Sequence, residues 1–157
     1  MTEASIDAAL AVSVRLVLER MFFIDLLDRL DSGGESPGIA AELSFDGDPP
    51  GSFRLAMDVA AARSAAADFL GENPRALTAG QLEDVVCELA NMICGSVLSQ
   101  IESSATFRLS KPAISSHRYC RQDSPAATFQ ASLGEGILRA EIHMERSVCT
   151  GIEESAS

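Results

Sequence analysis

The chain has 157 residues, of which 46% are hydrophobic, and its formal net charge is -11 at pH 7. A chain of this length can bury about 70% of the surface that it exposes when unfolded, so we expect one globular domain. The charge argues against nucleic acid and anionic membranes as partners, because both are bound by clustered basic side chains and the 12 Lys and Arg residues form no run.

The apolar N-terminal region does not resemble a membrane anchor or a signal peptide. A spanning helix would not carry charges such as Arg15, Glu19, Arg20, Asp25 and Asp28, which interrupt residues 8–30. The first residues include Glu3 and Asp7, whereas a signal peptide begins with a basic segment. We therefore expect a cytoplasmic protein.

The four cysteines, at positions 87, 94, 120 and 149, form no CxxC motif and have no His partner at metal-ligand spacing. Cys87 and Cys94 would lie about 10 Å apart along a helix, too far for a disulfide. We predict free, half-buried thiols and no metal site.

In chain order, the first half predicts a long helix and then a hairpin. Residues 5–30 are apolar over much of a helical circumference and therefore favour a largely buried helix. Apolar and polar residues alternate over residues 39–45 and again over residues 53–57, with Gly and Pro in the turn between them. This pattern predicts two antiparallel strands.

A short alanine-rich helix should follow over Val59 to Leu70, ended by Gly71 and Pro74. The longest helix is predicted over residues 78–102. Thr78 and Gln81 have the spacing of a capping box at its start.

The second half predicts more strands. Residues 105–109 and 113–119 favour short strands around Pro112, and residues 129–133 and 138–144 favour a second hairpin. Alternation places four polar residues on the exposed face of that hairpin, namely Arg139, Glu141, His143 and Glu145. We expect residues 1–149 to form the domain and residues 150–157 a disordered tail.

These elements predict an α+β fold in a single domain. Its sheet is mainly antiparallel, and its helices cover one face of the sheet.

The helix predicted at residues 78–102 has two different faces. At about 100° per residue, one face is apolar, comprising Val85, Val86, Leu89, Met92, Ile93 and Val97. The other face carries Asp84, Glu88, Asn91, Gly95 and Glu102, the first four within about 60° of one another. On pattern alone, a solvated face with an incidental glycine accounts for this arrangement.

The residues themselves are more specific than the pattern. Asp84-x-x-x-Glu88-x-x-Asn91, continued as ELANMICG and followed by Pro112, closely resembles the active helix of the CheC/CheX/FliY phosphatases of bacterial chemotaxis. The resemblance extends over residues 8–145 and is closest to CheX, which has one such motif rather than two. Here 20 residues separate Asn91 from Pro112, slightly fewer than is usual in the family.

The resemblance implies a fold with the first and central helices antiparallel on the sheet, and a phosphatase that dephosphorylates a CheY-like receiver domain. Asn91 would orient the attacking water, Glu88 would pair with a receiver lysine, and Asp84 and Gly95 would support contact with the receiver. Mg²⁺ would be the receiver's ion, and this chain would need no cofactor of its own. The family commonly dimerises through sheet edges, so a homodimer is compatible with the resemblance.

Two alternatives stay open at this point, a receiver-binding module without catalytic activity and a structural adaptor. The segment Glu19 to Phe22 occupies the place where two-motif relatives carry another ExxN. Because Phe22 stands where that asparagine would be, we interpret the segment as a packing element.

Overall fold

A computed structural model describes residues 3–21, 38–47, 50–101, 107–114, 126–132 and 136–144. Three helices and one short 3-10 helix accompany six strands within these residues. In chain order they are α1 (Glu3–Met21), β1 (Ile39–Asp46), β2 (Gly51–Met57), α2 (Val59–Leu70), η1 (Pro74–Ala76), α3 (Ala79–Ile101), β3 (Arg108–Leu109), β4 (Ala113–Ile114), β5 (Ala127–Ser132) and β6 (Ile137–Met144).

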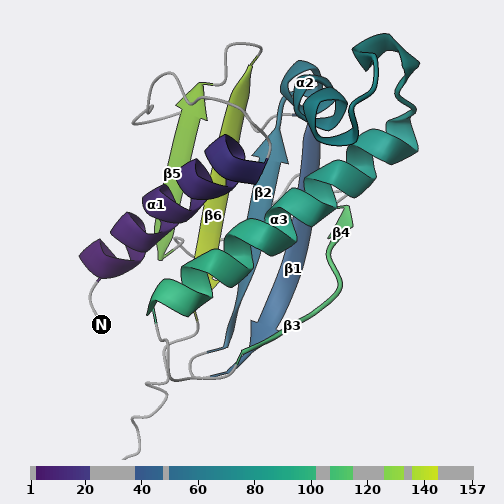
Figure 1. Ribbon diagram of the computed structural model, residues 1–157. Helices are drawn as coiled ribbons and strands as arrows, with labels where there is room; N and C mark the ends of the chain where they lie inside the picture. Colours follow the sequence, from purple (N-terminus) through teal and green to yellow (C-terminus); the bar gives the residue numbers. More distant parts are fainter. Residues whose placement is uncertain are drawn as a thin grey trace, which may run out of the picture.

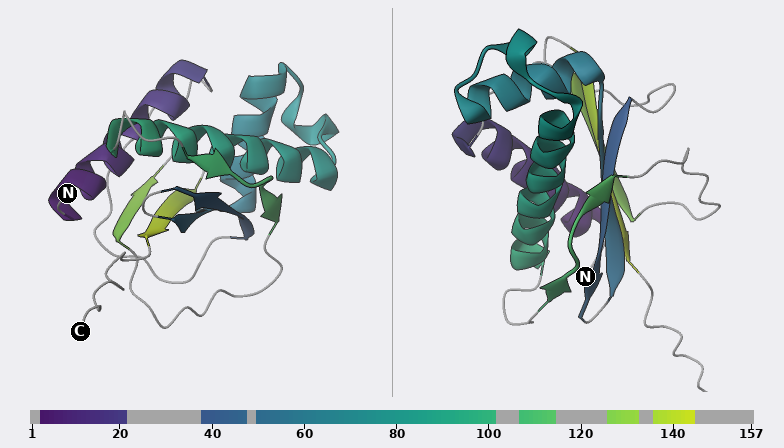
Figure 2. Two further views of the ribbon diagram at one scale, coloured as in Figure 1. Left: turned by 90° about the horizontal axis from the view of Figure 1, so that it is seen from below. Right: turned by 90° about the vertical axis from the view of Figure 1, so that its right-hand side faces the viewer.

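The strands form one antiparallel sheet in the order β3-β1-β2-β6-β5, with β4 also paired to β1. All three helices lie on the same face of this sheet (Figures 1 and 2). The helices α1 and α3 run antiparallel, with α3 over β1 and β2 and α1 over β5 and β6 (Figure 1). The fold is therefore α+β with helices on one face, as the sequence predicts.

The core lies between the sheet and the helices. Strand alternation turns one set of apolar residues inward, so that Leu43 pairs with Phe53, and Ala41 pairs with Leu55. On the neighbouring pair of strands, Phe129 lies opposite Ala140. All six residues are buried and belong to the hydrophobic core between the sheet and the helices.

Both predicted hairpins are present in the structure, and α2 has the predicted bounds. Gly71 ends α2 in the left-handed conformation (φ 67°), which glycine adopts without steric cost. The structure describes α1 only as far as Met21. The rest of the helix predicted over residues 5–30 therefore lies outside the described residues. Residues 150–157 also lie outside them.

The prediction that His143 lies on an exposed face is wrong. Its exposed fraction is 8%, and Arg54 and Gln130 on the same sheet face are exposed by only 6% and 5%. Glu42 forms an ion pair with Arg54, with 3.3 Å between Oε2 and Nε, and Arg139 forms one with Glu141 at 2.9 Å. Alternation correctly separates polar from apolar residues, but it does not determine how much of the polar face is accessible to water.

Within the described residues, α3 is the one helix that is long and apolar enough to cross a membrane. In this structure its apolar side packs onto the sheet and belongs to the hydrophobic core. Its composition is therefore that of a core helix.

Asp58 connects the end of β2 to the beginning of β6. Its carboxylate accepts a hydrogen bond from the backbone N–H of Ile137 (2.7 Å), and its own N–H donates to the Ile137 carbonyl (3.1 Å). Gly136 leaves room for this contact, because an added Cβ would meet Asp58 Oδ2 at 2.5 Å.

We predict that Asp58→Ala lowers the free energy of unfolding by about 1–3 kcal/mol, because the part-buried Ile137 N–H loses its acceptor. Urea denaturation followed by circular dichroism measures the change. Asp68→Ala on the exposed side of α2 is the matched control, for which we expect a change within about 0.5 kcal/mol. Equal stability of the two variants would contradict this role for Asp58.

Candidate functional site

A reciprocal capping box fixes the start of α3. The Thr78 hydroxyl accepts a hydrogen bond from the Gln81 N–H (3.1 Å), and the Gln81 side-chain oxygen accepts one from the Thr78 N–H (2.8 Å). Leu77 and Leu82 on either side of this box are both buried, in the positions of a hydrophobic staple. The capping box predicted at the start of the longest helix is thus confirmed.

Arg63 of α2 supports the same turn from outside. Its Nη1 donates hydrogen bonds to the carbonyl oxygens of Pro74 (3.0 Å) and Leu77 (3.3 Å). The side chain therefore joins α2 to the segment that leads into α3. Sequence reasoning missed this positioning residue, because a lone arginine in an alanine-rich helix carries no local signal for such a contact.

Burial fixes which side of α3 faces the solvent. Val85, Val86, Leu89, Ile93 and Val97 are all at most 4% exposed, as predicted, and only Met92 of the predicted apolar face is half-buried. Rotating the helix by one residue would turn this face by about 100° and expose several of these side chains. Each fully buried side chain of this size is worth about 1.5–3 kcal/mol, so the orientation is strongly determined.

The opposite side of α3 carries Asp84, Glu88, Asn91 and Gly95, which we call the polar ridge. Asp84 and Glu88 are exposed, whereas Asn91 and Gly95 are half-buried. Glu102, the last residue of the predicted face, lies outside the described residues.

The polar ridge has few internal constraints. Within the part of the chain that the structure describes, the side chains of Asp84, Glu88 and Asn91 make no hydrogen bond or ion pair. A Cβ added to Gly95 would meet no atom within 4 Å, so the surface there is open. A carboxylate and an amide one turn apart are therefore available to a group from outside the chain.

Pro112 lies at the sheet edge next to α3, in a β-bulge. Phe45 pairs with Leu109, and Ala41 pairs with Ile114, so residues 110–112 lie opposite only residues 43 and 44. Ser110 anchors this segment, since its N–H donates to the Ser44 carbonyl (2.8 Å) and its hydroxyl accepts from the Ser44 N–H (2.9 Å). Proline has no N–H for a ladder bond, which suits it to such a bulge.

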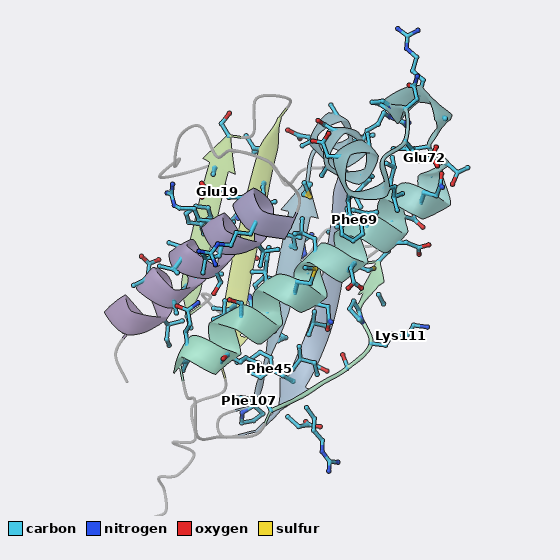
Figure 3. All side chains as sticks on the ribbon, in the orientation of Figure 1. Glu19, Phe45, Phe69, Glu72, Phe107 and Lys111 are labelled. Carbon is cyan, nitrogen blue, oxygen red and sulfur yellow. The ribbon has the colours of Figure 1, made fainter. Side chains whose placement is uncertain are left out.

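The segment Glu19 to Phe22, which corresponds to the second motif of two-motif relatives, is described only in part. Glu19 lies exposed on α1, away from α3's polar ridge (Figure 3), and Phe22 lies outside the described residues. The described residues thus contain one place where an ExxN pair is presented to the solvent.

The structure also has a pocket of about 400 Å³, which lies apart from the polar ridge. Its lining comes from β1, β2 and residues 110–113, and includes the ion-paired Glu42 and Arg54 together with Lys111. No residue of the polar ridge contributes to it. Among the described residues, no group of three or more His, Cys, Asp or Glu side chains is arranged to hold a metal ion.

Comparison with known protein families matches most of the described chain to one family. The family model described as "Chemotaxis phosphatase CheX" matches residues 39–128, which include the polar ridge and Pro112. A comparison with curated protein sequences gives no match.

Several solved structures share the architecture. The chemotaxis protein CheX from Vibrio vulnificus is 22% identical with a TM-score of 0.76, and the alignment covers 92% of this chain and 99% of that one. CheX from Borrelia burgdorferi, in a complex with CheY, BeF3 and Mg²⁺, is 18% identical with a TM-score of 0.70, covering 88% and 97%. Thermotoga maritima FliY is 11% identical with a TM-score of 0.60, covering 88% and 86%.

The two cysteines of α3 are free thiols with low intrinsic reactivity. Burial raises the pKa of Cys94 to about 12. The pKa of Cys87 is also raised, first by burial and then by the negative charges of Asp84 and Glu83. Because the thiolate is the reactive species, both groups are poor nucleophiles near neutral pH.

We predict that iodoacetamide at pH 8 leaves Cys94 unmodified in the folded protein and modifies it rapidly after denaturation in urea. Because the pKa of Cys94 is raised in the folded state, the free energy of unfolding should also fall as the pH rises above about 9, where this thiol ionises only in the unfolded protein. Peptide mass spectrometry reads out the modification, with Cys87 as the half-buried comparison. Rapid modification of Cys94 in folded protein would contradict its burial.

Proposed function

The chain belongs to the CheX family of chemotaxis phosphatases, and from this premise we propose that it hydrolyses the aspartyl phosphate of a CheY-like receiver domain. In the proposed reaction, Asn91 orients a water molecule for attack on phosphorus, and Glu88 anchors the receiver. The catalytic amide is supplied by this chain, whereas the aspartyl phosphate and its Mg²⁺ belong to the receiver.

The observation that supports this proposal most strongly is the outward presentation of Glu88 and Asn91 on a rigid helix. The two side chains are i, i+3 neighbours, about 5–6 Å apart at Cβ. Asn91 is half-buried rather than turned into the core, and the described residues offer neither side chain an internal partner. One group can therefore bind the receiver while the other reaches its phosphorus.

Such a pair suits phosphoryl transfer better than other hydrolytic chemistry. An amide is not a base near neutral pH, but its carbonyl oxygen accepts and its NH₂ group donates hydrogen bonds, so it can hold a water in a fixed orientation. Positioning and charge stabilisation supply most of the catalysis in phosphoryl transfer. As the water oxygen bonds to phosphorus, the bond from phosphorus to the aspartate oxygen breaks, which releases phosphate and restores the carboxylate.

The remaining ridge residues fit contact with a receiver. Glu88 is exposed and can pair with a receiver lysine, and Asp84 adds negative charge one turn before it. At Gly95 the absence of a side chain lets a partner's backbone approach the helix. The Borrelia burgdorferi relative, crystallised with CheY, BeF3 and Mg²⁺, supports a receiver as the partner.

We predict that Asn91→Ala lowers the rate of receiver dephosphorylation by about 10²–10³-fold, because a positioned polar group in the transition state is lost. Stability should change by no more than about 0.5 kcal/mol, since the Asn91 side chain makes no hydrogen bond within the described residues. Phosphate release from a phosphorylated CheY-like receiver measures the rate. Parental activity in this variant would remove the proposed role of Asn91.

The same assay separates the phosphatase from a receiver-binding module that does not catalyse hydrolysis. A phosphatase accelerates phosphate release in proportion to its concentration and turns over many receivers, whereas such a module binds without acceleration. Glu88→Ala should weaken receiver binding, with Glu83→Ala as its matched control. Glu83 is an equally exposed acid on α3 but points about 140° away from Glu88.

We predict that Gly95→Ala separates folding from function. The free protein should be as stable or more stable by up to about 1 kcal/mol, because alanine favours a helix and the new methyl group meets no atom. Receiver dephosphorylation should nevertheless fall, since the methyl group occupies the approach of the receiver backbone.

Gly80→Ala is the control for this variant, because an added Cβ there meets nothing closer than 3.9 Å. Residue 80 lies about 22 Å along α3 from residue 95 and is not part of the polar ridge. Dephosphorylation rates that are equal for both glycine variants and the parent would contradict a close approach at Gly95.

A further inference from the structure

The pocket of about 400 Å³ beside the Pro112 bulge has a polar floor on the sheet. Two cross-strand pairs form this floor, Glu42 with Arg54 and Ser44 with Ser52. These residues alternate with the core residues of β1 and β2, so they project from the sheet face that points away from the helices. The pocket and the polar ridge therefore lie on different sides of the molecule.

The wall of the pocket is the segment 110–113, which brings a second hydroxyl to the first. The Ser110 hydroxyl accepts a hydrogen bond from the Ser44 N–H (2.9 Å), and a hydroxyl that accepts still has its own proton to donate. The Ser44 hydroxyl is exposed and makes no hydrogen bond within the described residues. Two hydroxyl donors thus lie next to each other where the wall meets the floor.

The charge of the pocket comes from Lys111. The positive charge of Arg54 is offset by Glu42, with 3.3 Å between Nε and Oε2. Lys111 is the only lysine in a sequence of net charge -11, and within the described residues its ammonium group makes no ion pair. Figure 3 shows its side chain extending outward from the sheet edge, at the rim of the pocket. Its flexible four-carbon stem lets the ammonium group turn toward a ligand.

We propose that this pocket binds a small organic phosphate. Lys111 supplies the positive charge, and the hydroxyls of Ser44 and Ser110 donate hydrogen bonds to the phosphoryl oxygens. The pocket volume lies within the range of about 300–1,000 Å³ that is typical of small-molecule sites, so it has room for an organic part beside the phosphoryl group. The site would be additional to the polar ridge and does not depend on the proposed function.

The donor set suits a phosphoryl group better than a carboxylate. A planar carboxylate is matched by the fork of an arginine, and Glu42 already engages Arg54 in this pocket. A lysine acts on a phosphate as a point charge, without a planar requirement. The hydroxyls and the ammonium group come from β1 and from the segment 110–113, and they can approach different oxygens of a tetrahedral group.

The experiment is a titration of the protein with glycerol 3-phosphate, followed by the NMR shifts of the backbone amides. We expect saturable shifts at Ser44, Ser110 and Lys111, weaker binding of inorganic phosphate, and no binding of glycerol. Succinate is the carboxylate probe and should bind more weakly than glycerol 3-phosphate. The proposal would be overturned by an absence of saturable shifts at the pocket, or by equal binding of succinate.

Two variants test the assigned donors. Lys111→Gln should weaken glycerol 3-phosphate binding about tenfold, because one charge-assisted hydrogen bond is lost, whereas Lys111→Arg should retain most of the affinity. Ser44→Ala should weaken binding by less, since a neutral hydrogen bond is lost. Parental affinity in both Lys111→Gln and Ser44→Ala would overturn the assignment.

Arg75→Gln is the matched control for the loss of one positive charge. Arg75 is an exposed cation in η1 and does not line the pocket. We expect its affinity for glycerol 3-phosphate to equal that of the parent. An equal loss of affinity in Arg75→Gln and Lys111→Gln would show a general charge effect and overturn the site. Because no receiver is present in this titration, its result is separate from that of the dephosphorylation assay.

Discussion

The orientation of α3 about its own axis is the constraint on which the rest of the structure depends. The apolar side of this helix closes the core over the sheet, and the capping box of Thr78 and Gln81 fixes the residue at which the helix begins. With both fixed, Glu88 and Asn91 can only face outward. Core packing therefore positions the polar ridge, although no ridge residue belongs to the centre of the core.

The α2–α3 unit strengthens this constraint. Arg63 joins α2 to the turn before α3 through two carbonyl oxygens, and the alanine-rich face of α2 allows close packing against α3. On the sheet side, Ser110 anchors the bulge that contains Pro112 to β1. Arg63 thus fixes the segment that leads into the ridge helix, and Ser110 fixes the sheet edge beside that helix.

Local features of the sequence predict much of this architecture. Residue spacing correctly predicts the start of α3, the bounds of α2 and both hairpins, because capping, glycine termination and strand alternation act over a few residues. The polar ridge follows from the same helical periodicity, and the resemblance to the family gives it a chemical meaning. The roles of Asp84, Glu88, Asn91 and Gly95 remain predictions.

Features that depend on distant parts of the chain could not be predicted in this way. The pairing of β2 with β6 joins residues about 90 positions apart, and the burial of His143 depends on what surrounds the sheet rather than on alternation. The contact of Arg63 with the turn before α3 likewise requires the relative placement of two helices.

The scarcity of internal partners along the polar ridge has a consequence for how such proteins evolve. Among the described residues the side chains of Glu88 and Asn91 have no internal partner, so under the proposed mechanism substitutions there would remove the chemistry and leave the native state intact. Mutational drift could therefore convert an enzyme of this architecture into a protein that binds without catalysing, in very few steps. If Glu88 and Asn91 act as proposed, the identity of these two outward-facing residues is a better guide to activity within this architecture than its shape.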